Sequence, residues 1–459
     1  MLSRLLQPEI KSLIENKQFG ILKDILQEWT PTDIADLITN LEEKERVILF
    51  RLLHTEIAAD TFEYLDFDTQ IELLKSMGNE EVAKILNEMD PDDRTALFEE
   101  LPASAAKQLI QLLSPEERKI ALHLLGYPEN SIGRLMTPDY VAVNSSWTIK
   151  EALDYIRENG KNKETLNVVY VVDGKGRLID DIKIREFLLA PLDKKVYELM
   201  DENFVALNVY DDQEKAVSVL KKYDRVALPV VDNSGVLLGI VTVDDVMDVA
   251  EEETTEDIQK QAAVGVLEEP YSDIPILKMI KKRVGWLSVL FVGQMFTATA
   301  MAYFEDAIEK AVVLALFVPL IISSGGNSGS QAASLVVRAM ALGEITLNDW
   351  LKVFKRELLT GLSLGLILAL IGFLRFNILP APDDGFETYW IIITLVVSFS
   401  LIGVVMWGTL IGSMLPFLMK RLDFDPAASS TPFVATLVDV TGILIYFSIA
   451  MSLLKGKVL

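Results

Sequence analysis

The chain has 459 residues, 50% of them hydrophobic, and 67 acidic residues against 43 basic ones give it a formal net charge of -24. Such strong negative charge argues against nucleic acid as a partner of the charged region and favours cations. The sequence has no cysteine and two histidines, which excludes thiolate metal sites and favours hard cations bound through oxygen over transition metals.

The charge is concentrated in the first part of the chain. From Lys278 onward there are 14 basic and 12 acidic residues, whereas the preceding residues include 29 basic and 55 acidic ones. This contrast predicts a soluble acidic region followed by an apolar membrane region in one polypeptide. The first 18 residues contain charges and no apolar h-region, so we expect no signal peptide and a cytoplasmic location for the soluble region.

Residues 1–130 predict an all-α domain built as a helical superhelix. A capping residue precedes a proline at 30–31, 90–91 and 114–115, with acids in the first turn that follows, as at the start of many helices. Between these caps, apolar residues recur at helical spacing, for example Ile34, Leu37, Ile38 and Leu41. The simplest role of such an array is that of a scaffold.

Residues 131–252 contain an internal repeat. The segment 135–143 aligns with 199–207, and 170–178 aligns with 229–237. Each unit predicts strand, helix, strand, turn, strand and helix, an α/β arrangement that resembles a tandem pair of CBS domains.

CBS pairs often bind adenine nucleotides at a run of Gly, two apolar residues, Thr, two further residues and Asp. The second unit has this run at 239–245, which includes Thr242 and Asp245, whereas the first unit departs from it at 180–185. The resemblance therefore implies at most one nucleotide site, with ATP as the expected ligand and these two residues as its candidates. The alternative is a tight strand-to-helix turn without a ligand.

An acidic connector leads from the CBS pair toward the membrane region, and we predict a connecting helix at 253–282. Carboxylates at three- and four-residue spacings share one helical face and repel one another by a few tenths of a kcal/mol per pair. Bound divalent cations would reverse this repulsion; the alternative is a solvated helical face. The eight acids, with no basic residue among them, are Asp244, Asp245, Asp248, Glu251, Glu252, Glu253, Glu256 and Asp257.

Residues 283–459 predict an all-α transmembrane domain with five helices. Apolar stretches at 284–303, 311–341, 358–379, 389–419 and 431–454 are each long enough to cross a hydrocarbon core of about 30 Å. Basic residues collect before the first span and in the second and fourth loops, whereas the other two loops are acidic, the later one through Asp383, Asp384 and Glu387. This pattern predicts a multi-pass protein of the cell (inner) membrane with cytoplasmic N-terminal domains and an outside C-terminus.

Two polar features interrupt the predicted spans. Asp439 lies in the last span, where a carboxylate is costly unless it faces a cavity or a cation, so we interpret it as an ion-binding residue. The second span contains Asn327 within the glycine- and serine-rich run 323–331. That run predicts either close helix packing or a broken helix whose carbonyl groups line a cavity.

Together with 421–426 and 435–442, this run resembles the MgtE family of magnesium channels, and the resemblance extends over the whole chain. It implies a homodimer with a pore on the dimer axis, which the connecting helix plugs when cytoplasmic Mg²⁺ is high. Asp439 and Asn327 match the pore. The implied sensor residues are Asp60 and Asp92 in the helical domain, Asp224, Asp245 and Asp248 in the CBS pair, and Glu253, Glu256 and Asp257 along the connector, with Glu214 as a further expected ligand.

These features predict a Mg²⁺-selective channel, not an enzyme, that is closed by the ion it conducts. Because Mg²⁺ requires octahedral oxygen ligands and loses water reluctantly, Asp439 from both subunits would contact the waters of a hydrated ion. Three alternatives stay open: an exchanger coupled to Na⁺ or H⁺, a channel for a broader set of divalent cations, and a membrane-anchored nucleotide sensor without transport. An odd number of spans gives no equal halves for an inverted repeat, which favours a pore on a dimer axis within the lipid.

Overall fold

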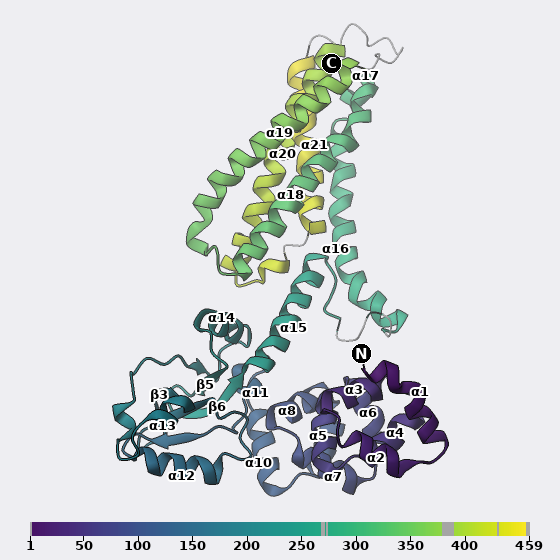
Figure 1. Ribbon diagram of the computed structural model, residues 1–459. Helices are drawn as coiled ribbons and strands as arrows, with labels where there is room; N and C mark the ends of the chain where they lie inside the picture. Colours follow the sequence, from purple (N-terminus) through teal and green to yellow (C-terminus); the bar gives the residue numbers. More distant parts are fainter. Residues whose placement is uncertain (1, 268–270, 272–273, 379–389, 429–430, 456–459) are drawn as a thin grey trace. The chain divides into compact units, whose positions relative to one another are not determined.

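The computed structural model describes residues 2–267, 271, 274–378, 390–428 and 431–455 (Figure 1). The chain forms two compact units, Met1–Ala250 and Glu251–Leu459. The loop acids Asp383, Asp384 and Glu387, which contributed to the predicted orientation, lie outside the described residues.

The first unit begins with short helices around a shared apolar core, which confirms the predicted all-α domain. The side chains of Thr30 and Ser114 accept the backbone N–H groups of Asp33 and Glu117, as expected for N-caps. The periodic residues Ile34, Leu37, Ile38 and Leu41 are buried. The helices are α1 (Leu2–Glu15), α2 (Phe19–Leu26), α3 (Pro31–Thr39), α4 (Glu43–Leu52), α5 (Thr55–Glu63), α6 (Phe67–Ser76), α7 (Asn79–Glu88), α8 (Pro91–Glu100), α9 (Ala103–Ile110) and α10 (Pro115–Leu124).

The rest of the first unit holds two sheets of identical topology, which confirms the α/β repeat. Their strand orders are β1 (Ala142–Asn144), β2 (Val168–Val172), β3 (Leu178–Lys183) and β4 (Leu207–Asn208), β5 (Ala227–Val231), β6 (Leu237–Thr242). In each sheet the first pair is parallel and the second antiparallel, with a register shift at the same place. Gly176 and Gly235 occupy equivalent turns with φ of 78° and 80°, a backbone region that favours glycine. The accompanying helices are α11 (Ile132–Leu135), α12 (Ile149–Asn159), α13 (Ile184–Leu189), η1 (Val196–Glu198) and α14 (Glu214–Tyr223).

The connector acids lie on one helix that begins directly after β6. This helix, α15 (Val243–Gln261), ends where Ala263 adopts a left-handed φ of 57°. Gln259 closes the end, because its carbonyl oxygen accepts the N–H of Val264 and its side-chain oxygen accepts the N–H of Leu267. Residues 253–282, expected as one connecting helix, therefore contain the end of α15 and the start of α16 (Ile276–Tyr303).

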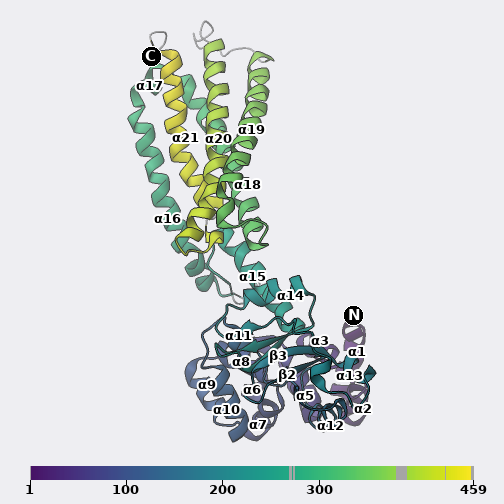
Figure 2. The same cartoon turned by 90° about the vertical axis from the view of Figure 1, so that its left-hand side faces the viewer.

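The second unit contains five helices long and apolar enough to cross a membrane, as predicted, within the described residues. Their ranges are Ile276–Tyr303, Val312–Ala341, Leu347–Arg375, Trp390–Arg421 and Thr431–Leu454. Figure 2 shows α16, α21 (Thr431–Leu454), α20 (Trp390–Arg421) and α19 (Trp350–Ile378) side by side in that order, and α18 (Val318–Ala341) packs against both α20 and α21. The third span starts earlier than predicted because its helix continues through the charged residues Lys352, Lys355 and Arg356. Short helices, α17 (Glu305–Lys310), η2 (Val312–Phe317), η3 (Leu347–Asp349) and η5 (Pro426–Ala428), adjoin the long ones.

The glycine-rich run of the second span is helical and serves close packing. A Cβ built on Gly408 would lie 2.3 Å from the carbonyl oxygen of Gly325, and one on Gly412 would lie 2.0 Å from that of Gly329. The backbones of α18 and α20 therefore touch at two successive turns. The packing alternative is confirmed and the broken helix is wrong, because α18 is continuous from Val318 to Ala341.

Replacing Gly412 by alanine tests this contact. No flexible side chain can move aside for the new methyl group, so the variant should lose about 1–3 kcal/mol of stability through overpacking. The measurement is the thermal unfolding of the purified protein in detergent. Gly285→Ala is the matched control, since a Cβ there meets nothing within 4 Å; equal melting temperatures for the two variants would contradict the prediction.

Candidate ion pathway and acidic clusters

A cavity of about 540 Å³ lies among α16, α18 and α21 in the second unit. The structure brings the two predicted pore residues, Asp439 and Asn327, to its wall. Its other lining is partly apolar and partly made of uncharged polar groups. The polar lining residues are Gln294, Thr297, Ser323, Asn327, Ser330, Thr431 and Asp439.

Asn327 faces this cavity because the glycines occupy the other side of α18. Gly325 and Gly329 are each two residues from Asn327, and two residues turn a helix by about 200°. The glycine face packs on α20, where Ser328 and Thr409 also share a hydrogen bond of 2.7 Å between their hydroxyl groups. The contact with α20 therefore directs the amide toward the cavity.

Asp439 has a partner that the sequence interpretation missed. The Gln294 side chain of α16 donates a hydrogen bond from Nε2 to Asp439 Oδ2 at 2.9 Å. The available signal in the sequence was a single amide side chain within a mostly apolar span. Asp439 itself is partly buried on α21.

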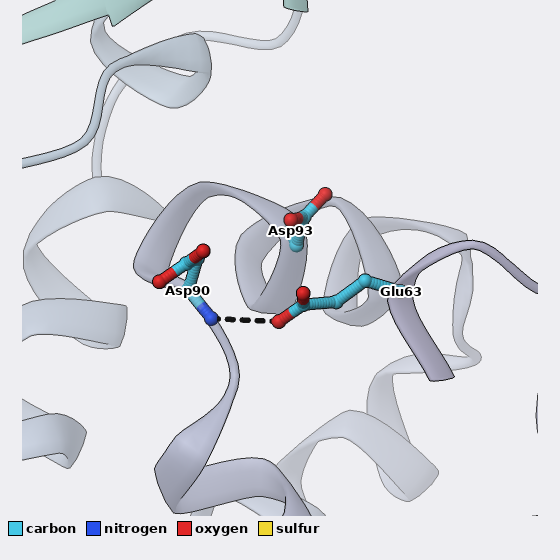
Figure 3. Close-up of side chains that lie close together, drawn as sticks. All are labelled: Glu63, Asp90 and Asp93. Carbon is cyan, nitrogen blue, oxygen red and sulfur yellow. Dashed lines mark hydrogen bonds between the residues drawn. The ribbon is translucent and has the colours of Figure 1, made fainter. Parts of the chain in front are cut away.

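Three carboxylates form a tight cluster in the first unit, shown in Figure 3. Glu63 comes from α5, while Asp90 and Asp93 belong to the start of α8, and one oxygen of each lies within 4.8 Å of those of the other two. Glu63 accepts the backbone N–H of Asp90 at 2.8 Å. Loss of hydration, followed by the charge of Asp93, raises the pKa of Glu63 from 4.5 to about 8. At neutral pH this raised pKa favours the protonated form of Glu63, which lowers the negative charge of the cluster.

The predicted sensor residue Asp60 lies one turn before Glu63 on α5. Its negative charge contributes to the raised pKa of Glu63 and of Asp90. Its own pKa is raised by burial and then by Glu56. The predicted sensor residues therefore include Asp60 beside the cluster but not Glu63, and they include Asp92 rather than Asp93.

A second group of acids lies where the helical domain and the CBS pair meet. Its members are Asp92, Asp93, Glu164 and Asp245, and the charge of Asp245 contributes to the raised pKa of the other three. Asp92 is 9% exposed, and within the described part of the chain its Oδ1 has no hydrogen-bond partner. Burial, and then the charge of Asp245, raise its pKa well above 3.8. Burial also raises the pKa of Asp93 and of Glu164 to about 7, and that of Asp245 to about 6.

The first turn of α8, which carries several of these acids, is held by a buried arginine. Arg94 is 0% exposed and donates to the carbonyl oxygens of Leu86 and Met89 at 2.9 and 3.2 Å. It also forms an ion pair with Glu117 of α10. Because Arg94 is fully buried, loss of Glu117 would leave an unpaired buried charge, which is strongly destabilising.

The candidate nucleotide residues Thr242 and Asp245 contact each other at the start of α15. The Thr242 hydroxyl donates to Asp245 Oδ2 at 2.6 Å. A strand-to-helix turn accounts for this contact without a ligand. Within the departing run of the first CBS unit, Asp181 forms an ion pair with Arg225 at 2.8 Å.

The remaining predicted sensor residues of the CBS pair are more dispersed. Glu214 begins α14, whereas Asp224 is its exposed C-cap with a left-handed φ of 51°. A ten-residue helix is about 15 Å long, so this structure does not bring these two carboxylates together. Asp248 is exposed on α15, and its charge contributes to the raised pKa of Asp93 and Asp245.

The end of α15 carries an ion-pair network within the second unit. Lys260 Nζ lies 2.7 Å from Asp425 Oδ2 in the loop before α21, and it also pairs with Glu256. The nearby pKa of Asp257 is raised to about 6 by burial and then by Asp425. The predicted connector residues Glu253, Glu256 and Asp257 are all partly buried, while Lys260 and Asp425 were not among the predicted site residues.

The raised pKa of Glu63 predicts a pH dependence of local stability. In the folded state Glu63 binds a proton between pH 4.5 and about 8 that the unfolded chain has released, so stability falls as pH rises through this window. Hydrogen exchange of the α8 amides in Mg²⁺-free buffer, corrected for intrinsic exchange rates, should show protection decreasing toward pH 8.

Glu63→Gln removes this titration and should make the pH profile shallower, while Asp93, whose pKa is raised to about 7, continues to titrate. Glu80→Gln is the matched control, because Glu80 lies exposed on α7 and outside the cluster. If Glu63→Gln keeps the pH dependence of the unmodified protein, Glu63 is not the titrating group.

Family models match most of the chain. Residues 318–449 match the MgtE model, described as a divalent cation transporter. Residues 29–130 match the MgtE intracellular N domain. Residues 132–193 and 196–252 each match the CBS domain.

Known proteins are similar over nearly the full length. The chain is 39% identical over 444 residues to the magnesium transporter MgtE of Thermus thermophilus, with 95% of each chain covered. It is 32% identical over 450 residues to that of Enterococcus faecalis, with 96% of each covered.

Two solved structures resemble the soluble part. The cytosolic domain of the Mg²⁺ channel MgtE in complex with ATP is 33% identical, with a TM-score of 0.51, over 53% of this chain and 100% of that one. The soluble part of a magnesium transporter is 28% identical, with a TM-score of 0.52, over 55% of this chain and 99% of the other.

Proposed function

Because the chain belongs to the MgtE family of magnesium transporters, we propose that it is a Mg²⁺-selective channel for magnesium uptake whose pore contains Asp439. Magnesium transport is the activity of this family, which is not a family of enzymes. The single observation that carries the channel proposal is the cavity of the second unit, whose wall includes both Asp439 and Asn327.

The cavity suits a hydrated ion. Six waters occupy roughly 180 Å³ at about 30 Å³ each, which is well below the 540 Å³ of the cavity. The Asp439 carboxylate and the Asn327 side-chain oxygen would accept hydrogen bonds from the waters that coordinate Mg²⁺. In a homodimer, a second Asp439 would add its charge across the axis and exclude anions.

Gating in this proposal uses the carboxylates of the soluble unit and of the connector. Mg²⁺ bound there would cancel their repulsion and stabilise a closed dimer, and its loss would free the pore. A site at about ten times its Kd contributes ~1.4 kcal/mol, so about four such sites reach the ~5.5 kcal/mol that reverses a 1:99 equilibrium. The proposed sensor residues are Asp60, Asp92, Glu214, Asp224, Asp245, Asp248, Glu253, Glu256 and Asp257.

The proposed division of the chain follows from these roles. Residues 1–130 and 131–252 form the cytoplasmic sensor, 253–282 connect it to the gate, and 283–459 form the membrane domain with an outside C-terminus. ATP is a proposed ligand of the CBS pair, supported by the relative whose cytosolic domain was solved with ATP. A nucleotide at Thr242 and Asp245 would have to replace their mutual hydrogen bond.

Asp439→Ala tests the pore assignment in proteoliposomes loaded with a Mg²⁺ indicator. Two unit charges 4 Å apart attract each other by ~4 kcal/mol at an effective dielectric constant of 20. Loss of the carboxylate removes such an attraction for the cation, so Mg²⁺ flux should fall by on the order of tenfold or more. Asp306→Ala, on the exposed short helix α17, controls for the loss of an acid outside the spans. Undiminished flux through Asp439→Ala would reject the pore role.

The same vesicles separate a channel from an exchanger. Collapsing the Na⁺ and H⁺ gradients should leave Mg²⁺ flux unchanged, whereas dependence on either gradient would favour the coupled exchanger. Flux of Mn²⁺, Co²⁺ or Ca²⁺ at the rate of Mg²⁺ would instead favour the broader channel.

Neutralising the connector tests the gate. The triple variant Glu253→Gln, Glu256→Gln, Asp257→Asn should stay open at cytoplasmic Mg²⁺ concentrations that close the unmodified channel in patch-clamp recordings, because each lost site removes ~1.4 kcal/mol of closure. Glu305→Gln with Glu309→Gln, on α17, is the control for altered surface charge. Normal closure of the triple variant would reject the connector as a sensor.

A further inference from the structure

The carboxylate assigned to the pore is held by an amide from another helix. We propose that Gln294 of α16 is a positioning residue of the ion pathway, which orients Asp439 and presents its own oxygen to the waters of the passing ion. This inference rests on the proposed pore role of Asp439. Within the described residues, Gln294 is the one side chain that donates a hydrogen bond to Asp439.

The packing of α16 on α21 places Gln294 at this position. A Cβ built on Gly293 would lie 2.8 Å from Thr436 Cγ2, so the two helices approach closely at Gly293, directly before Gln294. The Thr436 hydroxyl donates to the carbonyl oxygen of Pro432 in its own helix, which leaves the methyl group to pack against Gly293. Thr436 and Asp439 are three residues apart and share one face of α21.

The chemistry of the two groups fixes how the amide is turned. An ionised carboxylate only accepts hydrogen bonds, whereas the glutamine amide has a donor nitrogen and an acceptor oxygen. Nε2 therefore faces Asp439, and Oε1 is the atom left for other contacts. Because Gln294 lines the same cavity as Asn327, Oε1 can accept a hydrogen bond from an ion-bound water.

A purely structural role for Gln294 predicts a different behaviour. An interhelical hydrogen bond in a membrane also stabilises helix packing, and its loss would then lower stability without changing how flux depends on Mg²⁺ concentration. A positioning role changes that dependence, because each ion meets a less ordered carboxylate and one oxygen fewer. The Mg²⁺ concentration at half-maximal flux therefore separates the two roles.

The first experiment compares Gln294→Leu with the unmodified protein in proteoliposomes. The half-maximal Mg²⁺ concentration should rise roughly tenfold, the effect of losing a hydrogen bond to a charged group. Thr299→Val is the matched control on the same helix, because the Thr299 hydroxyl donates only to the carbonyl oxygen of Met295 among the described residues. An unchanged half-maximal concentration for Gln294→Leu, with transport intact, would overturn the proposal.

The second experiment keeps the combined length of the two side chains while changing each. Gln294→Asn removes one methylene and Asp439→Glu adds one, so each single variant should raise the half-maximal concentration. The double variant Gln294→Asn/Asp439→Glu should bring it back toward the original value. If the effects of the two substitutions simply add, the proposed pairing is overturned. This test also decides the proposal if Gln294→Leu fails to fold.

Parallel measurement of Asp439→Ala keeps the two proposals distinguishable. If Asp439→Ala transports Mg²⁺ normally, the pore assignment fails and the Gln294 inference fails with it. If Asp439→Ala stops transport while Gln294→Leu and the length-exchange pair leave the half-maximal concentration unchanged, the Gln294 inference alone is wrong.

Discussion

Repulsion between closely spaced carboxylates is the constraint on which the organisation of this protein depends. Glu63, Asp93 and Glu164 have pKa values raised to about 8, 7 and 7, because the fold removes water from acids that already face other acids. Burial of an ionised carboxylate is costly unless a proton, an ion pair or a metal compensates it. The first unit therefore carries an electrostatic cost that protons or bound cations would relieve.

The fold maintains this arrangement through apolar and cationic anchors beside the acids. Arg94 fixes the first turn of α8 from within the core, and β6 passes directly into α15 at Thr242 and Asp245. Asp245, whose charge raises the pKa of Asp92 and Asp93 on α8, lies on the same helix as the connector acids, since α15 continues to Gln261.

The membrane unit uses close backbone contact to place its polar groups. Glycines on α18 touch those on α20, and Asn327 is thereby turned to the cavity on the other side. Gly293 serves a similar purpose between α16 and α21, where it brings Gln294 to Asp439. Small residues in membrane helices permit such approach because packing, not hydrophobic burial, drives association in lipid. The same glycines that stabilise the bundle thus position the candidate pore.

The sequence by itself determined the class of each region, since that information is local. Helix caps at Thr30 and Ser114, the repeated strand pattern of 131–252 and five apolar stretches each follow from neighbouring residues, and all are present. Asp439 was recognisable alone because a carboxylate in an apolar segment is costly wherever the helix packs.

Only the tertiary structure decided which polar groups meet. Glu63 lies 27 positions from Asp90 and Gln294 lies 145 positions from Asp439, so no spacing rule connects either pair. The glycine run had two acceptable interpretations until the partner helix α20 was known. Where hydration is lost, and hence which carboxylates have a raised pKa, depends on surfaces brought together by folding, and periodicity along one chain does not contain that information.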